Sequence, residues 1–241
     1  MTKKIKAALL LLIISLTAFS GGVYVGLEEV FPFKVYKVIW NAAFDKPVVK
    51  PALREVNVRL SQFEAFDSKS DFVFVGDSLI ERGEWAEFFP KLSLKNRGVG
   101  GDTTLSVLNR IDDVKSLSPK YVFLSIGFND IRAYRSTENI LATYTLIVNS
   151  LRESGINVII QSTIQCSPKR SKDWSQHISE LNNALEKFAS EKEIRFIDLG
   201  VLSDDTGLSL IYSQDGVHLN GTGYKEWVKI ISPVIYALNT D

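Results

Sequence analysis

The feature that most constrains the fold is a regular alternation of short apolar runs with amphipathic segments from Asp71 to the carboxyl terminus. Apolar residues recur at helical spacing in three longer segments, residues 140–151, 174–188 and 224–238. Other short runs have the length and the valine, isoleucine and phenylalanine content of buried strands. We predict strands at residues 72–75, 94–97, 121–126, 158–161 and 195–199. Strands that alternate with helices predict an α/β fold with a five-stranded parallel sheet and helices on both faces.

The composition is that of an ordinary globular domain, and it excludes several functions. Of 241 residues, 45% are hydrophobic and 23% are charged, a balance typical of folded proteins. The 28 basic residues equal the 28 acidic residues, so no net positive field favours a nucleic-acid partner. The single cysteine, Cys166, permits no disulfide within the chain, and there are only two histidines. We therefore expect no metal and no cofactor.

The first 27 residues have the pattern of a membrane anchor. Three lysines precede an uncharged run from Ala7 to Leu27, which as a helix would span about 30 Å, the thickness of a bilayer core. We predict an N-terminal transmembrane helix within residues 1–27. The lysines favour an amino terminus inside the cell and a catalytic domain outside the cytoplasm, in the periplasm or at the cell surface. Ala18 and Ser20 also fit a signal peptide cleaved after Ser20, which would give a secreted protein.

A connecting segment, residues 28–70, is predicted to separate this anchor from a folded domain at residues 71–241. Three prolines interrupt the segment. Val56, Val58 and Leu60 alternate with polar residues, as they would in a short strand or in a stalk. The sequence leaves both interpretations open.

Glycines and polar residues follow the first three predicted strands. Gly76-Asp77-Ser78 follows the first strand, Gly98 to Thr103 the second, and Gly127 to Asp130 the third. The carboxyl ends of parallel strands meet at one edge of a sheet, where ligands bind. These loops are therefore predicted to form one site. A serine hydroxyl placed there becomes a nucleophile when a histidine removes its proton.

A histidine and a carboxylate with suitable spacing lie before the last predicted helix. In the segment from Asp215 to His218, the carboxylate three residues upstream could orient the imidazole. The glycine-rich second loop presents an unshielded backbone amide, and Asn129 has side-chain N–H groups. With the amide of Ser78, these groups would offer three donors to an oxyanion. Each motif alone is also ordinary turn chemistry, but their common edge favours catalysis.

These four blocks, in this order, resemble those of the SGNH or GDSL hydrolase superfamily. The block from Gly98 to Thr103 is most similar to that of the platelet-activating-factor acetylhydrolase catalytic subunits and their bacterial relatives. The resemblance covers about residues 71–238, and it implies a three-layer flavodoxin-like fold and the hydrolysis of esters or thioesters. By this resemblance, Ser78 matches the family's nucleophile, Asp215 its supporting acid and His218 its base. Gly101 and Asn129 match its oxyanion donors.

We therefore expect a serine ester hydrolase that forms an acyl-enzyme with a small ester. The substrate would be an O-acetyl group on a glycan or a lysophospholipid, the latter lying close to the membrane that the anchor enters. The alternative is a membrane-anchored module that binds a glycan or a lipid on the same fold without catalysis.

Five further residues are expected to have supporting or structural roles. Asp77, Asp102 and Asp130 are expected to support the site, the last two by pairing with backbone amides or arginines. His177 has no carboxylate pattern near it and is interpreted as structural. Nothing beside Cys166 suggests a lowered pKa, so it is interpreted as a pocket or core residue.

Overall fold

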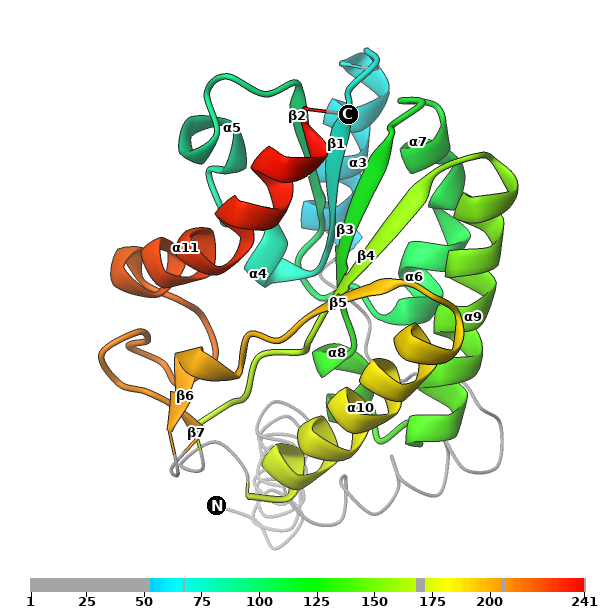
Figure 1. Cartoon of the computed structure of the whole chain (residues 1–241). Coiled ribbons are helices and arrows are strands. Elements are labelled where there is room, and N and C mark those ends of the chain that lie inside the picture. The colour runs from blue at the N-terminus through cyan, green and yellow to red at the C-terminus, as the bar shows by residue number, and fades with distance from the viewer. Residues whose placement is uncertain (1–52, 67, 168–171, 205–206, 241) are drawn as a thin grey trace, which may run out of the picture. The chain divides into compact units, whose positions relative to one another are not determined.

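The computed structural model describes residues 53–66, 68–167, 172–204 and 207–240. At its centre is a parallel sheet of five strands in the order β2-β1-β3-β4-β5 (Figure 1). The strands are β1 (Phe72–Gly76), β2 (Leu94–Gly98), β3 (Tyr121–Ser125), β4 (Asn157–Gln161) and β5 (Arg195–Ile197). All five lie within two residues of the predicted positions, and their order is that of flavodoxin-like folds. The predicted α/β fold with a five-stranded parallel sheet is confirmed.

Five helices of the described ranges cover the first face of the sheet (Figure 1). The side chains buried beneath them are mostly aliphatic. These helices are α6 (Thr104–Asn109), α7 (Ile111–Lys115), α8 (Phe128–Arg132), α9 (Thr137–Glu153) and α10 (Lys172–Glu191). Successive strand residues point to opposite faces, so Val73 and Val75 of β1 belong to this layer. The predicted helical spacing is confirmed, since Ile140, Tyr144 and Ile147 of α9 are all buried here.

The second face carries an aromatic layer beneath α4 (Ser78–Glu81), α5 (Trp85–Phe88) and α11 (Gly221–Leu238). The ring of Phe74 stacks on Trp85 with centroids 4.3 Å apart, and Trp85 meets Trp227 of α11 edge-on at 5.0 Å. Truncating a buried aromatic side chain of this size typically costs about 3–5 kcal/mol of folding free energy. This layer therefore fixes α11, which begins three residues after His218, against the sheet.

Part of the predicted connecting segment is a helix, α3 (Leu53–Ala65). The short strand, one of the two interpretations of the alternation of Val56, Val58 and Leu60, is wrong for these residues. Val58 is exposed, whereas Phe63 is buried, with the guanidinium of Arg97 4.3 Å from the centre of its ring. Three alternating residues are too few to set a period, and the contact of Phe63 with Arg97 lies further along the helix.

A short element absent from the prediction lies between β5 and the loop of His218. A 3₁₀ turn, η1 (Gly200–Leu202), leads into an antiparallel hairpin of β6 (Ser203–Asp204) and β7 (Gly207–Leu208).

None of the helices in the described ranges is long and apolar enough to cross a membrane. The predicted anchor at residues 1–27 lies outside those ranges, as does most of the connecting segment.

Candidate active site

Ser78 lies at a sharp turn from strand to helix at the carboxyl end of β1. Gly76 ends the strand, and a Cβ atom there would lie 2.2 Å from the carbonyl oxygen of Ser125 on the neighbouring strand, so only glycine fits. Asp77 caps helix α4 by accepting a hydrogen bond from the backbone N–H of Leu79 at 3.0 Å. The cap ends the strand and leaves Ser78 as the first helical residue, at the edge where the sequence placed it.

The structure brings Ser78, His218 and Asp215 together. The Ser78 Oγ atom lies 3.0 Å from His218 Nε2, across 140 residues of sequence. On the other side of the imidazole, Nδ1 lies 2.7 Å from Asp215 Oδ2. An ionised carboxylate only accepts hydrogen bonds, so Nδ1 carries a proton, and in the neutral imidazole Nε2 is then free to accept from the Ser78 hydroxyl.

The loop of residues 213–218 holds the carboxylate and the imidazole in this geometry. Asp215 Oδ1 accepts hydrogen bonds from the backbone N–H groups of Val217 and His218, at 2.9 and 2.7 Å. Gly216 allows the turn because its φ of +78° is unfavourable for other residues. Partial burial would raise the pKa of Asp215, but the hydrogen bonds from the His218 ring and from these backbone amides outweigh it. The pKa of Asp215 is therefore lowered well below its ordinary value.

Two residues that the sequence did not single out for the site also position His218. The buried hydroxyl of Ser213 donates to the His218 carbonyl oxygen at 2.7 Å and accepts from the Gly216 N–H at 2.9 Å. The Tyr224 hydroxyl donates to the carbonyl of Leu79 at 2.7 Å and so ties α11 to the helix that begins with Ser78. A serine two residues before an aspartate is a turn signal, but no sequence pattern predicts the contact of Tyr224.

The three predicted oxyanion donors follow three strands at this edge of the sheet, Ser78 and Asn129 in the first turns of α4 and α8 and Gly101 in a loop. In the described part of the chain, the backbone N–H groups of Ser78 and Gly101 have no hydrogen-bond acceptor. Gly101 has a φ of +81°, a conformation that favours glycine. Asn129 is buried on the first turn of α8, and its Nδ2 donates to the carbonyl of Asp102 at 2.9 Å. The same Nδ2 lies 3.5 Å from Asp77 Oδ2, a long contact for the second N–H group of the amide.

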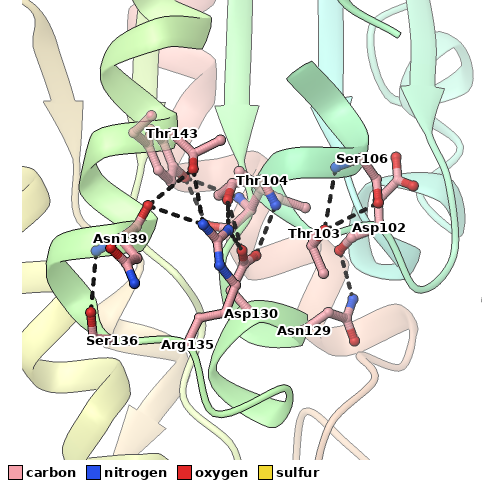
Figure 2. Close-up of polar contacts among 12 residues, drawn as sticks. Asp102, Thr103, Thr104, Ser106, Asn129, Asp130, Arg135, Ser136, Asn139 and Thr143 are labelled. Carbon is pink, nitrogen blue, oxygen red and sulfur yellow. Dashed lines mark hydrogen bonds and ion pairs between the residues drawn. The ribbon is translucent and has the colours of Figure 1, made fainter. Parts of the chain in front are cut away.

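Buried carboxylates brace the loops that carry these donors (Figure 2). Asp130 accepts hydrogen bonds from the backbone and the hydroxyl of Thr104, at 2.8 and 2.7 Å, and pairs with Arg135 at 2.8 Å. Asp102 pairs with Arg110 at 2.8 Å. These contacts tie the loop after β2 to helices α6 and α8.

Burial raises the pKa of all three supporting carboxyl groups. The pKa of Asp77 rises to about 7, because its full burial outweighs the hydrogen bond from Leu79 and the neighbouring Asp102 and Asp130 add to the rise. Burial also raises the pKa of Asp102, to about 6, although Arg110 opposes the rise. Burial also raises the pKa of Asp130 against the opposing bonds from Thr104 and Arg135.

Comparison with known proteins identifies the family. The model of the GDSL-like lipase/acylhydrolase family matches residues 74–226, more than half of the chain. The chain belongs to this family. It is a carboxylic ester hydrolase of the GDSL type.

Relatives of this GDSL-like acylhydrolase include the platelet-activating factor acetylhydrolase IB subunit alpha2 of the rat. It is 28% identical over 184 residues, which cover 71% of this chain and 79% of the relative. Among solved structures, a GDSL-like lipase from Bacteroides thetaiotaomicron aligns with a TM-score of 0.66 at 24% identity, over 76% of this chain and 98% of its own. An acetylxylan esterase from Geobacillus stearothermophilus aligns with a TM-score of 0.58 at 17% identity, over 69% and 94%. Both structures share the fold of the acylhydrolase.

The second histidine of the acylhydrolase lies away from this arrangement. His177 is exposed on α10, and its Nδ1 lies 3.2 Å from Glu180 Oε2. The expectation that no carboxylate accompanies His177 is therefore wrong, because residues three apart on a helix are neighbours. The pair is exposed on the helix surface, where such ion pairs have little effect on stability.

Cys166 is buried among the aliphatic side chains of the first face. Burial raises the pKa of its thiol, although a contact with Ser175 opposes the rise. A protonated, buried thiol is a poor nucleophile, in agreement with its interpretation as a core residue. In the described ranges, no three acidic, histidine or cysteine side chains are grouped so that they could hold a metal ion.

Proposed function

We propose that this protein is a serine esterase that removes short acyl groups, with Ser78 as the nucleophile. The observation that carries the proposal is the unbroken chain of contacts from Ser78 Oγ through the His218 ring to Asp215, at 3.0 and 2.7 Å. Family membership gives ester hydrolysis, and this geometry supports the assignment of the reaction to these three residues.

In the first half of the reaction, Ser78 attacks the carbonyl carbon of the ester. His218 Nε2 takes the hydroxyl proton as the bond forms, and the positive imidazole is stabilised by the carboxylate of Asp215. The carbonyl oxygen becomes negative and is stabilised by the N–H groups of Ser78, Gly101 and Asn129. The tetrahedral intermediate collapses when His218 gives the proton to the leaving alcohol, which leaves an acyl group on Ser78.

In the second half, water replaces the alcohol. His218 takes a proton from the water, whose oxygen attacks the acyl carbon, and the same donors stabilise the second oxyanion. Collapse of this intermediate releases the carboxylic acid and returns the proton to Ser78. The low pKa of Asp215 keeps its carboxylate ionised throughout, so it orients the imidazole in both halves.

We propose acetyl esters as the substrates. The names of two matched proteins, an acetylhydrolase and an acetylxylan esterase, both refer to acetyl groups, which favours a short acyl group over a long one. The alcohol would be a glycan or a lysolipid. With the apolar segment of residues 1–27 as an anchor, the catalytic domain would work outside the cytoplasm, next to the membrane.

A panel of p-nitrophenyl esters from acetate to octanoate, run beside an acetylated oligosaccharide and a lysophospholipid, tests this proposal. The full-length chain should hydrolyse the acetate ester with the highest kcat/KM, and Ser78→Ala should hydrolyse none of the panel. Binding of the oligosaccharide or the lipid without turnover would favour the binding-module alternative. A preference for octanoate would contradict the acetyl assignment.

A further inference from the structure

Helix α3, which precedes the sheet in sequence, reaches the loop that carries one of the proposed oxyanion donors. Arg59 Nε donates a hydrogen bond to the carbonyl oxygen of Gly98 at 3.2 Å, across 39 residues of sequence. Gly98 is the last residue of β2 and the first of the loop that leads to Gly101. The contact therefore falls at the base of that loop.

The same guanidinium also contacts the helix that begins with Ser78. Arg59 Nε lies 3.8 Å from Glu81 Oε1, and Glu81 is the last residue of α4. A Cβ atom on Gly100 would lie 2.7 Å from Glu81 Oε2 and 3.9 Å from Ser78 Cβ. Gly100 in the glycine loop thus lies beside both Glu81 and Ser78, and Arg59 places a positive charge next to Glu81.

Between these two contacts the backbones are packed tightly. A Cβ atom on Gly98 would lie only 2.2 Å from the backbone nitrogen of Glu81. Such packing prevents the glycine loop and α4 from moving closer together, but it does not prevent them from separating. Asn96 of β2 already links them, since its Nδ2 donates to the carbonyls of Ile80 and Glu81 at 2.9 and 3.1 Å and its Oδ1 accepts from the Gly98 N–H at 2.8 Å. Arg59 adds a second link, from helix α3, between Gly98 and Glu81.

The guanidinium of Arg59 is itself held in place. It lies 5.0 Å from the centre of the Phe63 ring, on the same helix, and its side chain is 23% exposed. Partial burial lowers the pKa of Arg59, while Glu81 opposes the change. Arginine remains charged in proteins even so. A cation restrained by an aromatic ring loses little further freedom when it binds its two partners.

We infer that Arg59 is a positioning residue for the oxyanion hole. It joins the loop of residues 98–101 to helix α4. The inference rests on the proposed function, in which the N–H groups of Ser78 and Gly101 stabilise the oxyanion. Arg59 would keep these two N–H groups at the correct distance from each other. Arg59 does not touch the reacting atoms. Its effect arises because a misplacement of about 1 Å at a reacting centre can lower a rate by about 10²-fold.

The test compares variants of the full-length chain on p-nitrophenyl acetate, with kcat, KM and the thermal midpoint measured for each. Arg59→Ala should lower kcat about tenfold with KM changed by less than about twofold, a fraction of the 10²–10³ that loss of a whole oxyanion donor costs. Arg59→Lys keeps a donor and a positive charge and should recover most of kcat. If Arg59→Ala does not fold, Arg59→Gln, which keeps a side-chain N–H donor without the charge, should also lower kcat.

Arg152→Ala is the matched control. Arg152 also donates to a backbone carbonyl, that of Lys192 at 3.0 Å, but near the amino end of β4, at the opposite end of the sheet. Its kcat should equal that of the wild type. A normal kcat in Arg59→Ala, or a raised KM alone, would overturn the role of Arg59. The Ser78→Ala variant separates this inference from the proposed function. Activity in Ser78→Ala refutes the proposed function. If Ser78→Ala is inactive and Arg59→Ala is fully active, only the role of Arg59 is refuted.

Discussion

Replacing Asp77 by asparagine should change how the stability of the protein depends on pH. The ordinary pKa of an aspartate side chain is 3.8, and burial raises that of Asp77 to about 7. Between these two pH values the folded protein binds a proton that the unfolded chain has released. The contribution of Asp77 to the free energy of unfolding therefore falls as the pH rises from about 4 to about 7, and is constant above that range.

The size of the effect follows from the shift. A change of about 3 pKa units corresponds to about 4 kcal/mol in full, of which about 3 kcal/mol falls between pH 5 and pH 8. Asparagine is neutral at every pH in this range. Its side-chain oxygen can still accept the hydrogen bond from Leu79 N–H that Asp77 Oδ1 accepts at 3.0 Å. The variant should therefore lack this part of the pH dependence while keeping the helix cap.

Urea unfolding of the wild type and of Asp77→Asn at pH 5 and pH 8 measures the effect directly. The difference in unfolding free energy, variant minus wild type, should be about 3 kcal/mol more positive at pH 8. Asp102 and Asp130 interact with Asp77, so the measured difference also includes any change in their own titration. A difference that does not change with pH would refute the reasoning, because it would mean that Asp77 titrates alike in the folded and unfolded states.

Four further variants test the site. His218→Ala should lose ester hydrolysis, while His177→Ala, whose contact with Glu180 is on the surface, should keep it; the reverse would move the base to His177. Asn129→Ala should lower kcat by about 10² to 10³ with little change in KM, and a raised KM alone would make Asn129 a residue that binds the ground state. Ser213→Ala removes the hydroxyl that bridges Gly216 N–H and the His218 carbonyl, so kcat should fall about tenfold. Unchanged kcat in the Ser213 variant would show that Asp215 holds the loop unaided.

The sheet and its helices were predictable because local patterns and tertiary packing agree there. The run from Phe72 to Val75 is apolar on both faces, as a central parallel strand must be, and the buried positions of α9 follow the helical period. Loops at the carboxyl ends of neighbouring strands had to meet at one edge. The meeting of Ser78 with His218 follows from this topology together with the placement of the last helix.

What could not be predicted depends on contacts between residues far apart in sequence. Helix α3 was missed because its deciding contact, Phe63 with Arg97, lies outside the local pattern. The contribution of Arg59 became visible only with Gly98 and Glu81 beside it. The bond from Tyr224 to the carbonyl of Leu79 spans most of the folded chain, and a tyrosine on a helix gives no sign of its partner.

The acyl-enzyme itself is the most direct test of the central claim. The full-length protein is mixed with p-nitrophenyl acetate, quenched in acid within the first turnover, digested and examined by mass spectrometry. The account predicts one acetyl group on the peptide that contains Ser78, and none on that peptide in Ser78→Ala. An acetyl group on another residue, or rapid turnover of the ester by Ser78→Ala, would contradict it.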